Sequence, residues 1–339
     1  MRENKRLGKR TVRLAQPPVI LGEASIVGKK EGEGPLRDCF DHIEQDTTFG
    51  QDTWERAESH MQTLCLRKAL EKASLAADRL HCLFAGDLLN QCIGSTYGLR
   101  EFGVPMAGLF GACSTMAEGL ALAAMNLDGG FSDYAAAITS SHFCTAERQF
   151  RMPLEYGGQR PPTAQWTVTG SGAMVLSAQG EGPRITHCTL GRIVDMGVTD
   201  ANHMGGAMAP AACDTLEAYF QDTGTRPQQY DLIVTGDLGY LGRGVVLDQF
   251  QQQGMELAGV YDDCGCMIYD ASRQDVNSGG SGCGCSAVVL AGYILPRLRS
   301  GEWKDVLFVG TGALMSPTAC QQGESIPGIA HLVRIQSGM

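Results

Sequence analysis

Short apolar runs alternate along the chain with longer stretches in which apolar residues recur at helical spacing. The runs within 80–91 and 230–242 are both followed by Gly-Asp-Leu, as is typical of a buried strand that ends in a turn. Residues 52–73 and 208–224 place apolar side chains every three or four positions and predict two helices. Strands that alternate with helices predict an α/β protein whose strands are largely buried.

A second shared pattern indicates an internal repeat. Residues 111–124 and 282–295 both carry Cys-Ser shortly after a glycine, followed by an apolar, small-residue helix pattern. Cys113 and Cys285 each precede, by 20 residues, an aspartate at the start of a further apolar run. The spacing therefore predicts a chain built from two duplicated α/β halves.

The predicted halves are residues 1–180 and 181–339, and the first of them begins with a basic arm, residues 1–13. One interpretation of the arm is a frayed, solvated terminus. The other is an electrostatic contact with anionic lipid or with an acidic partner. No apolar stretch along the chain is long enough for a secretory signal or a membrane span. We therefore expect no transmembrane segment and, at most, a peripheral association with a membrane.

The net charge and the cysteine content limit the classes of function that the chain could have. A net charge of −10 over 339 residues argues against a general nucleic-acid binder. The thirteen cysteines are scattered through a long chain, which predicts reduced thiols inside a cell rather than a secreted disulfide framework. The pairs Cys264/Cys266 and Cys283/Cys285 have a closer spacing than most structural zinc sites use. Small residues surround them, so we predict close packing at a turn, with no metal and no cofactor.

Cys113 follows an apolar run at the predicted start of a helix, where backbone N–H groups favour negative charge. That placement lowers a thiol pKa and is typical of a nucleophile. A duplicated α/β unit with a cysteine at this point resembles the thiolase fold. In that family the cysteine takes an acyl group, and histidine or asparagine residues of the second half activate it.

The second half of this chain departs from that family pattern. No histidine lies between residues 204 and 330, and the corresponding stretch, 261–270, offers aspartate and cysteine but no imidazole. Condensing chemistry needs a base and an oxyanion hole. We therefore predict a degenerate thiolase-like protein that is not an enzyme, in which Cys113 lines a pocket.

A closer resemblance covers nearly the whole chain. The segments "LFAGDLLNQ", "LFGACST", "TAERQFR", "GGAMAPAA", "DCGCMIY" and "SPTACQQGESIPGIAH" occur in this order and resemble the stage V sporulation protein AD family of endospore-forming bacteria. The resemblance implies a thiolase-like fold of duplicated halves in αβαβα layers. It also implies a protein that binds dipicolinic acid and supports its uptake, with calcium, into the developing spore.

The same resemblance implies a location and partners. The protein is expected in the forespore, at the inner membrane of the spore, beside other stage V sporulation A membrane proteins and with a role that extends to germination. The thiolase fold commonly pairs through strands of its first half, which implies a homodimer. Dipicolinic acid, free or as its calcium chelate, is the expected ligand, and nucleic acid is not.

Dipicolinate is a flat pyridine with two carboxylates, so its site needs hydrogen-bond donors, positive charge and apolar walls. The start of the helix at Cys113 supplies backbone N–H groups. The segment 139–151 supplies hydroxyls, an imidazole and two arginines on a loop after a predicted strand. The predicted ligand-binding residues are Cys113, Ser140, Ser141, His142, Arg148, Arg151, Asp263 and Ser281.

Three of these residues have structural alternatives. Arg148 could instead form a surface ion pair with Glu147 or Glu155. His142 could be a hydrogen-bonded core histidine. Asp263 would repel a dicarboxylate unless it were protonated or bridged by calcium, so capping of nearby backbone N–H groups is the favoured role for it.

Two other functions stay open at the level of the sequence. The first is an acyl-transferring, condensing-type enzyme that uses Cys113. The second is a structural subunit of a spore membrane channel, for which the basic arm is the main support. Acylation of Cys113 would indicate the first function, whereas membrane association that depends on residues 1–13 would indicate the second.

Overall fold

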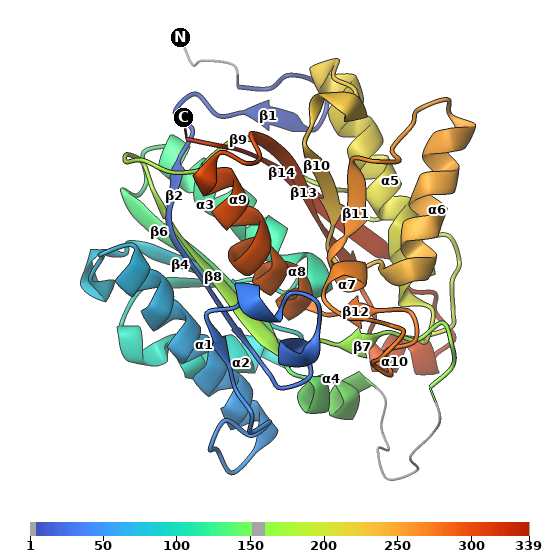
Figure 1. Ribbon diagram of the computed structural model, residues 1–339, viewed down its shortest axis with the longest axis horizontal. Coiled ribbons are helices and arrows are strands. Elements are labelled where there is room, and N and C mark those ends of the chain that lie inside the picture. The colour runs from blue at the N-terminus through green and yellow to red at the C-terminus, as the bar shows by residue number, and fades with distance from the viewer. Residues whose placement is uncertain (1–4, 151–159, 339) are drawn as a thin grey trace.

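The computed structural model describes residues 5–150 and 160–338, which form a layered α/β fold (Figure 1). One twelve-stranded sheet runs through it. From the middle outward, its two sides have the orders β2-β8-β6-β4-β5 and β9-β14-β13-β10-β11. On each side the first two pairings are antiparallel and the last two are parallel. The predicted duplication is therefore present in the topology of the sheet.

The strands have the following bounds. The first side of the sheet contains β2 (Val19–Val27), β4 (Cys82–Gly86), β5 (Met106–Gly108), β6 (Tyr134–Ser141) and β8 (Gly170–Ser177). The second side contains β9 (Arg184–Thr189), β10 (Leu232–Thr235), β11 (Tyr261–Asp263), β13 (Asp305–Ala313) and β14 (Gly328–Gln336). Shorter strands are β1 (Thr11–Arg13), β3 (His42–Ile43), β7 (Trp166–Thr167) and β12 (Gly280–Ser281). The two sides meet where β2 pairs with β9, and we keep the boundary at 180/181, between β8 and β9, as a proposal.

Helices form the other layers of the molecule (Figure 1). Helix α1 packs on β2 and β8, whereas α5 packs on β13 and β14. Helix α3 lies between the two sides of the sheet, in contact with β4, β6, β13 and β14. The helices are α1 (Trp54–Lys72), α2 (Ile93–Leu99), α3 (Thr115–Asp128), α4 (Phe143–Phe150), α5 (Met204–Thr223), α6 (Gly239–Gln252), α7 (Cys264–Met267), α8 (Cys283–Val289), α9 (Leu295–Ser300) and α10 (Pro317–Gln321). A π-helical segment, Leu290–Ile294, joins α8 to α9.

The small residues of α3 explain its place in the middle layer. Ala117, Ala121 and Ala124 are fully buried. Short side chains let the helix approach both sides of the sheet closely, and a Cβ added at Gly310 of β13 would lie only 2.7 Å from the Ala117 Cβ. Burial on both faces accounts for a helix that is apolar around most of its circumference.

Both helices predicted from periodicity are confirmed, and one boundary is corrected. The segment predicted at 52–73 contains α1 (Trp54–Lys72), whose first turn is capped by Thr53, which accepts a hydrogen bond from the Arg56 N–H. Helix α5 begins at Met204, earlier than the predicted start at residue 208, and Pro210 lies inside it. The helix ends before Gly224, whose positive φ of 69° suits glycine at that position.

The basic arm is ordered over residues 5–13, so the interpretation as a frayed terminus is wrong there, although residues 6–9 are exposed to solvent. Lys5 forms a 2.6 Å ion pair with Asp128 at the end of α3, and Arg10 forms one of 2.7 Å with Asp214 of α5. The Asp222 carboxylate accepts three backbone N–H groups of the arm. The arm therefore connects elements of both halves of the molecule.

Among the residues that the structure describes, no helix combines the length and the apolar character needed to cross a bilayer.

Candidate ligand-binding site

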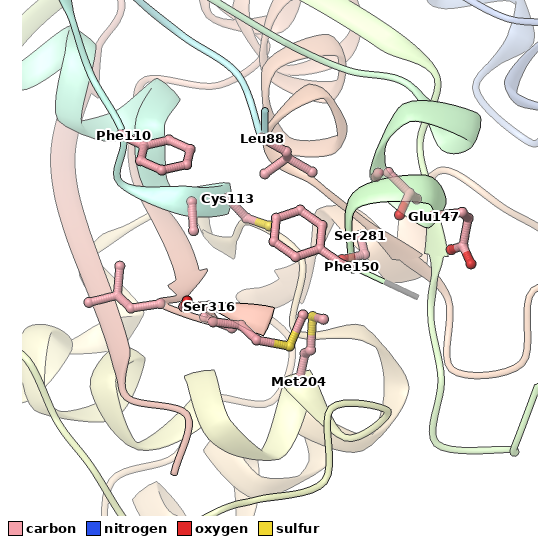
Figure 2. A pocket seen from close by; sticks show the side chains of 14 residues that line it. Leu88, Phe110, Cys113, Glu147, Phe150, Met204, Ser281 and Ser316 are labelled. Carbon is pink, nitrogen blue, oxygen red and sulfur yellow. The ribbon is translucent and has the colours of Figure 1, made fainter. Parts of the chain in front are cut away.

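A cavity of about 270 Å³ opens in front of Cys113 (Figure 2). Its volume is close to the lower limit of about 300 Å³ for small-molecule sites. Both halves of the chain line it, from Leu88 and Phe110 in the first to Met204 and Ser281 in the second. Its walls are mainly apolar, and the side chains of Phe110 and Phe150 stand on either side of Cys113 in Figure 2.

Cys113 lies in a tight turn at the edge of this cavity. The residue lies in the 3-10 turn Ala112–Ser114 that leads into α3, and its side chain is almost fully buried. Ala112 has φ of 51°, a left-handed conformation that is uncommon for a residue with a side chain. Strained backbone of this kind is frequent at ligand and catalytic sites, where the surrounding structure holds it in place.

Cys283 is the cysteine of the second half that lies in the same apolar cluster as Cys113. It begins α8, after Gly282 with φ of 100°. Cys285, which the sequence repeat matched with Cys113, also lies in α8 but belongs to the central core cluster. The match between Cys113 and Cys285 stays a prediction.

Asp237 is the acidic neighbour of Cys113, close enough for each of the two groups to affect the pKa of the other. Its carboxylate accepts the Gly282 N–H at 2.8 Å and the Thr311 hydroxyl at 2.8 Å. The Ser281 hydroxyl lies 3.3 Å away. Complete burial raises the pKa of Asp237 to about 6, although these hydrogen bonds oppose the shift.

The Cys113 thiol is not activated. Its burial, followed by the nearby Asp237 and Cys283, raises its pKa well above the ordinary value of 9.0. The prediction that the helix start would lower this pKa is wrong, because desolvation and a neighbouring acid dominate. The described lining of the cavity contains no histidine.

Three adjacent predicted residues lie away from the cavity. Ser140 and Ser141 are buried at the end of β6 and donate hydrogen bonds to Glu58 (2.8 Å) and to the Val168 carbonyl (2.7 Å). The His142 ring bonds the Thr47 carbonyl at 2.8 Å, and burial lowers its pKa. His142 is therefore a hydrogen-bonded core histidine, which was the structural alternative to a ligand contact.

Arg148 does not supply charge to the described cavity. It forms an ion pair with Glu55 and lies 5.3 Å from the Trp54 ring centre, so Glu55 rather than Glu147 is its partner among the described residues. Glu155, the other glutamate expected, lies outside them. Helix α4 turns this side chain toward α1 rather than toward the cavity. Arg151 lies outside the described residues.

Asp263 is fully buried and caps backbone rather than facing the cavity. Its carboxylate accepts hydrogen bonds from the N–H groups of Leu238 (2.8 Å), Gly239 (2.9 Å) and Gly265 (3.0 Å). Burial raises its pKa to about 7. Of the predicted ligand-binding residues, Cys113 and Ser281 are those that line the cavity.

Sequence comparison decides the family. The family model for stage V sporulation protein AD matches residues 8–336. Stage V sporulation protein AD of Bacillus subtilis (strain 168) is 46% identical over 324 residues, which cover 96% of each chain. The chain belongs to the stage V sporulation protein AD family.

Solved structures place the family in a wider fold group. Xanthomonas campestris OleA superimposes with a TM-score of 0.63 and 18% identity, covering 96% of this chain and 99% of that one. The 3-oxoacyl-[acyl-carrier-protein] synthase III of Aquifex aeolicus gives a TM-score of 0.56 and 11% identity, with 94% and 99% coverage. At these identities the likeness concerns the fold, which is thiolase-like, as predicted.

The sequence did not predict that Asp237, Glu147 and Phe110 lie at this sporulation-family site. Asp237 carried a usable signal, because it belongs to the second Gly-Asp-Leu of the repeat. That repeat was used for the architecture alone. Phe110 had no pattern that separates a cavity wall from a core residue.

The four paired cysteines do not form a metal centre. Within residues 5–150 and 160–338, no group of three or more His, Cys, Asp or Glu side chains is arranged to hold a metal ion. Cys264, Cys283 and Cys285 are completely buried. Burial raises the pKa of each of these thiols, so they pack as small apolar groups, as the sequence predicted.

Proposed function

We propose that this member of the stage V sporulation protein AD family is a non-catalytic protein that binds dipicolinate in the cavity at Cys113. The observation that carries the proposal is the burial of Cys113 at the cavity, with the buried acid Asp237 rather than a base or a cation as its charged neighbour. A nucleophilic cysteine needs a base or a cation that stabilises its thiolate, whereas a buried acid disfavours the thiolate. The site retains the thiolase-like position of the cysteine without its chemistry.

The shape and the lining of the cavity support a flat aromatic ligand. Phe110 and Phe150 offer ring faces, and Leu88 and Met204 complete apolar walls. Thr167, Ser281 and Ser316 supply hydroxyl groups that donate hydrogen bonds to carboxylate oxygens. A small, mainly apolar cavity with a few polar groups is typical of a binding site for a small molecule.

The wider role that we propose follows the family. Binding of dipicolinate supports its uptake, with calcium, into the developing spore, at the inner membrane and beside other stage V sporulation A membrane proteins, with a further role in germination. A homodimer is part of the proposal. The edge strand β5 pairs with β4 on one side, and Met106 and Phe110, in and just after it, are exposed.

Acyl transfer at Cys113 is the alternative function. It is favoured by the fold, because a solved structure of the thiolase-like OleA contains bound lauric acid and lauroyl-CoA. It is opposed by the raised pKa of the Cys113 thiol. The third candidate function is that of a purely structural subunit of a channel. Its main support was the basic arm, and that support is weaker because Lys5 and Arg10 of the arm form ion pairs within the chain.

Two measurements on the purified chain test the proposal. Calorimetric titration should give saturable binding of dipicolinate and much weaker binding of benzoate, which lacks the second carboxylate. Intact-mass measurement after incubation with an acyl-coenzyme A should leave the mass unchanged. Equal affinity for the two aromatic acids, or an acyl adduct on Cys113, would overturn it.

A further inference from the structure

The cavity has a charge pattern that is unexpected for a ligand with two carboxylates. Among the described residues that line it, Glu147 is the charged one, and lysine and arginine are absent. Asp237, next to Cys113, adds a second acid close to the cavity. A dianion needs positive charge within reach of the cavity, and among the described residues that charge has to come from behind the lining.

Arg160 is that cation, because it is the ion-pair partner of Glu147. The Arg160 side chain is 18% exposed, so most of it is removed from solvent. Its guanidinium lies 4.9 Å from the Phe143 ring centre and 4.8 Å from that of Trp166, and these two rings stack at 4.0 Å. Contacts with ring faces hold the planar group in place without satisfying its N–H donors.

The backbone links Arg160 to the floor of the cavity. One Arg160 nitrogen donates to the Gln165 carbonyl at 2.6 Å, immediately before β7. Strand β7 pairs with β12 so that Thr167 lies opposite Ser281, and both residues line the cavity. The Gln165 side chain in turn donates to the Asp237 carbonyl at 2.7 Å. Arg160 is thus positioned by the same small sheet that forms the polar side of the site.

We propose that Arg160 is the carboxylate-binding residue of the site and that Glu147 is the resident anion that a ligand carboxylate displaces. A guanidinium has five N–H donors. The contacts among described residues use one for Gln165 and one for Glu147, which leaves donors for a two-point contact with a carboxylate. This inference rests on the proposed function, since it assumes an aromatic dicarboxylate in the cavity.

The inference predicts opposite effects for the two members of the ion pair. Arg160→Met should weaken dipicolinate binding by about 10- to 100-fold, the loss expected for charge-assisted hydrogen bonds. Arg160→Lys keeps the positive charge but lacks the planar guanidinium that binds both carboxylate oxygens, so it should cause an intermediate loss of affinity. Glu147→Gln should strengthen binding by about threefold or more, because the competing carboxylate is removed.

Arg243→Met is the matched control. Arg243 also pairs with an acid, Asp262 at 3.1 Å, and also lies over a ring, 5.9 Å from the centre of Tyr261, but it is not at the cavity. Its substitution should leave the affinity within about twofold of the unaltered chain. Titrations of all variants by calorimetry, together with their thermal unfolding, provide the readout.

The outcomes separate the inference from the function on which it rests. If Arg160→Met unfolds the chain by removing the cation beside the buried Glu147 carboxylate, the double variant Glu147→Gln with Arg160→Met also removes the carboxylate charge and should still bind dipicolinate weakly. Unchanged affinity in a folded Arg160 variant would overturn the role of Arg160 and leave dipicolinate binding intact. No binding by the unaltered chain would overturn the proposed function and this role with it.

Discussion

The two Gly-Asp-Leu segments occupy equivalent places in the two halves, but their aspartates bind different partners. Asp87 follows β4 and Asp237 follows β10, the second strands from the outer edge on each side of the sheet. Asp87 accepts the Ser95 N–H and hydroxyl, both at 2.7 Å, and the Leu89 N–H at 2.9 Å. These partners lie two and eight residues further along the chain, so Asp87 closes a local turn.

Asp237 instead connects distant parts of the molecule. Its partners include Gly282 before α8 and Thr311 of β13, and Cys113 of the other half is its neighbour. Burial raises the pKa of both aspartates, so burial alone does not distinguish them. The comparison teaches that one motif, duplicated in one fold, can support local structure in the first copy and shape a ligand site in the second.

Replacement of either aspartate by alanine gives the largest expected effect and tests this comparison. Asp237→Ala leaves the Gly282 N–H and the Thr311 hydroxyl without an acceptor in a buried site. We expect it to lower the free energy of unfolding by about 3 kcal/mol and to abolish dipicolinate binding. Asp87→Ala should cost about as much stability but leave the affinity of the folded fraction within about twofold. Denaturant unfolding and calorimetry measure the two quantities, and equal losses of affinity would remove the distinction.

The next effect is on the stability of the chain as a function of pH. Burial, followed by Asp87, raises the pKa of Glu58 from 4.5 to about 8, and burial raises that of Asp237 from 3.8 to about 6. Between pH 4 and 8 the folded chain therefore holds more protons than the unfolded chain at these two sites. Their contribution to stability is greatest at low pH and is lost as the pH rises through the folded pKa values.

Glu58→Gln should flatten this dependence. At pH 8 we expect the variant to be more stable than the unaltered chain by about 2 kcal/mol, and at pH 5 the difference should shrink or reverse. Thermal unfolding at a series of pH values provides the measurement. A difference that is the same at pH 5 and pH 8 would show that the Glu58 carboxyl does not titrate in this range.

A smaller effect concerns the reactivity of Cys113. Asp237→Asn keeps an acceptor oxygen for the neighbouring donors but removes the negative charge beside the thiol. We expect the rate of alkylation of Cys113 by iodoacetamide at pH 8 to rise by about tenfold, with little change at Cys283. Peptide mass spectrometry resolves the two cysteines. An unchanged rate would mean that burial alone keeps the thiol protonated.

The smallest expected effect is that of Cys113→Ala on ligand affinity. Loss of one sulfur from the wall removes a few contacts, so dipicolinate should bind about two- to fivefold more weakly. The stability of the variant should stay close to that of the unaltered chain. A complete loss of binding would indicate that the thiol itself holds the ligand.

The repeat, the buried strands and the helix that starts at Cys113 could be predicted from the sequence, because apolar periodicity and Gly-Asp-Leu are local signals. The position of Cys113 at a cavity followed from the same helix start. The polar segment 140–148 was predicted to supply ligand-binding side chains, but its predicted residues do not line the cavity, for a physical reason. Ser140 and His142 satisfy their hydrogen bonds inside the first half, and residue type does not reveal on which side of a strand end a side chain finds its partner.

The contacts that define the site join residues far apart in the chain. Asp237 reaches Cys113 across 124 positions, and the Ser281–Thr167 pairing joins strands from the two halves. Such contacts depend on how the layers are stacked, which periodicity does not specify. The ion pair between Glu147 and Arg160 spans a shorter distance in sequence, but its place at the cavity also follows from tertiary packing.

The most direct test of the account is the pH profile of Cys113 alkylation in the unaltered chain, measured with and without saturating dipicolinate. A protected, unactivated thiol predicts slow alkylation whose rate is still rising with pH at about pH 9, without a plateau, and slows at least tenfold when the ligand is present. Rapid alkylation near neutral pH that dipicolinate does not slow would contradict it. That result would reveal an active nucleophile in a cavity that the ligand does not occupy.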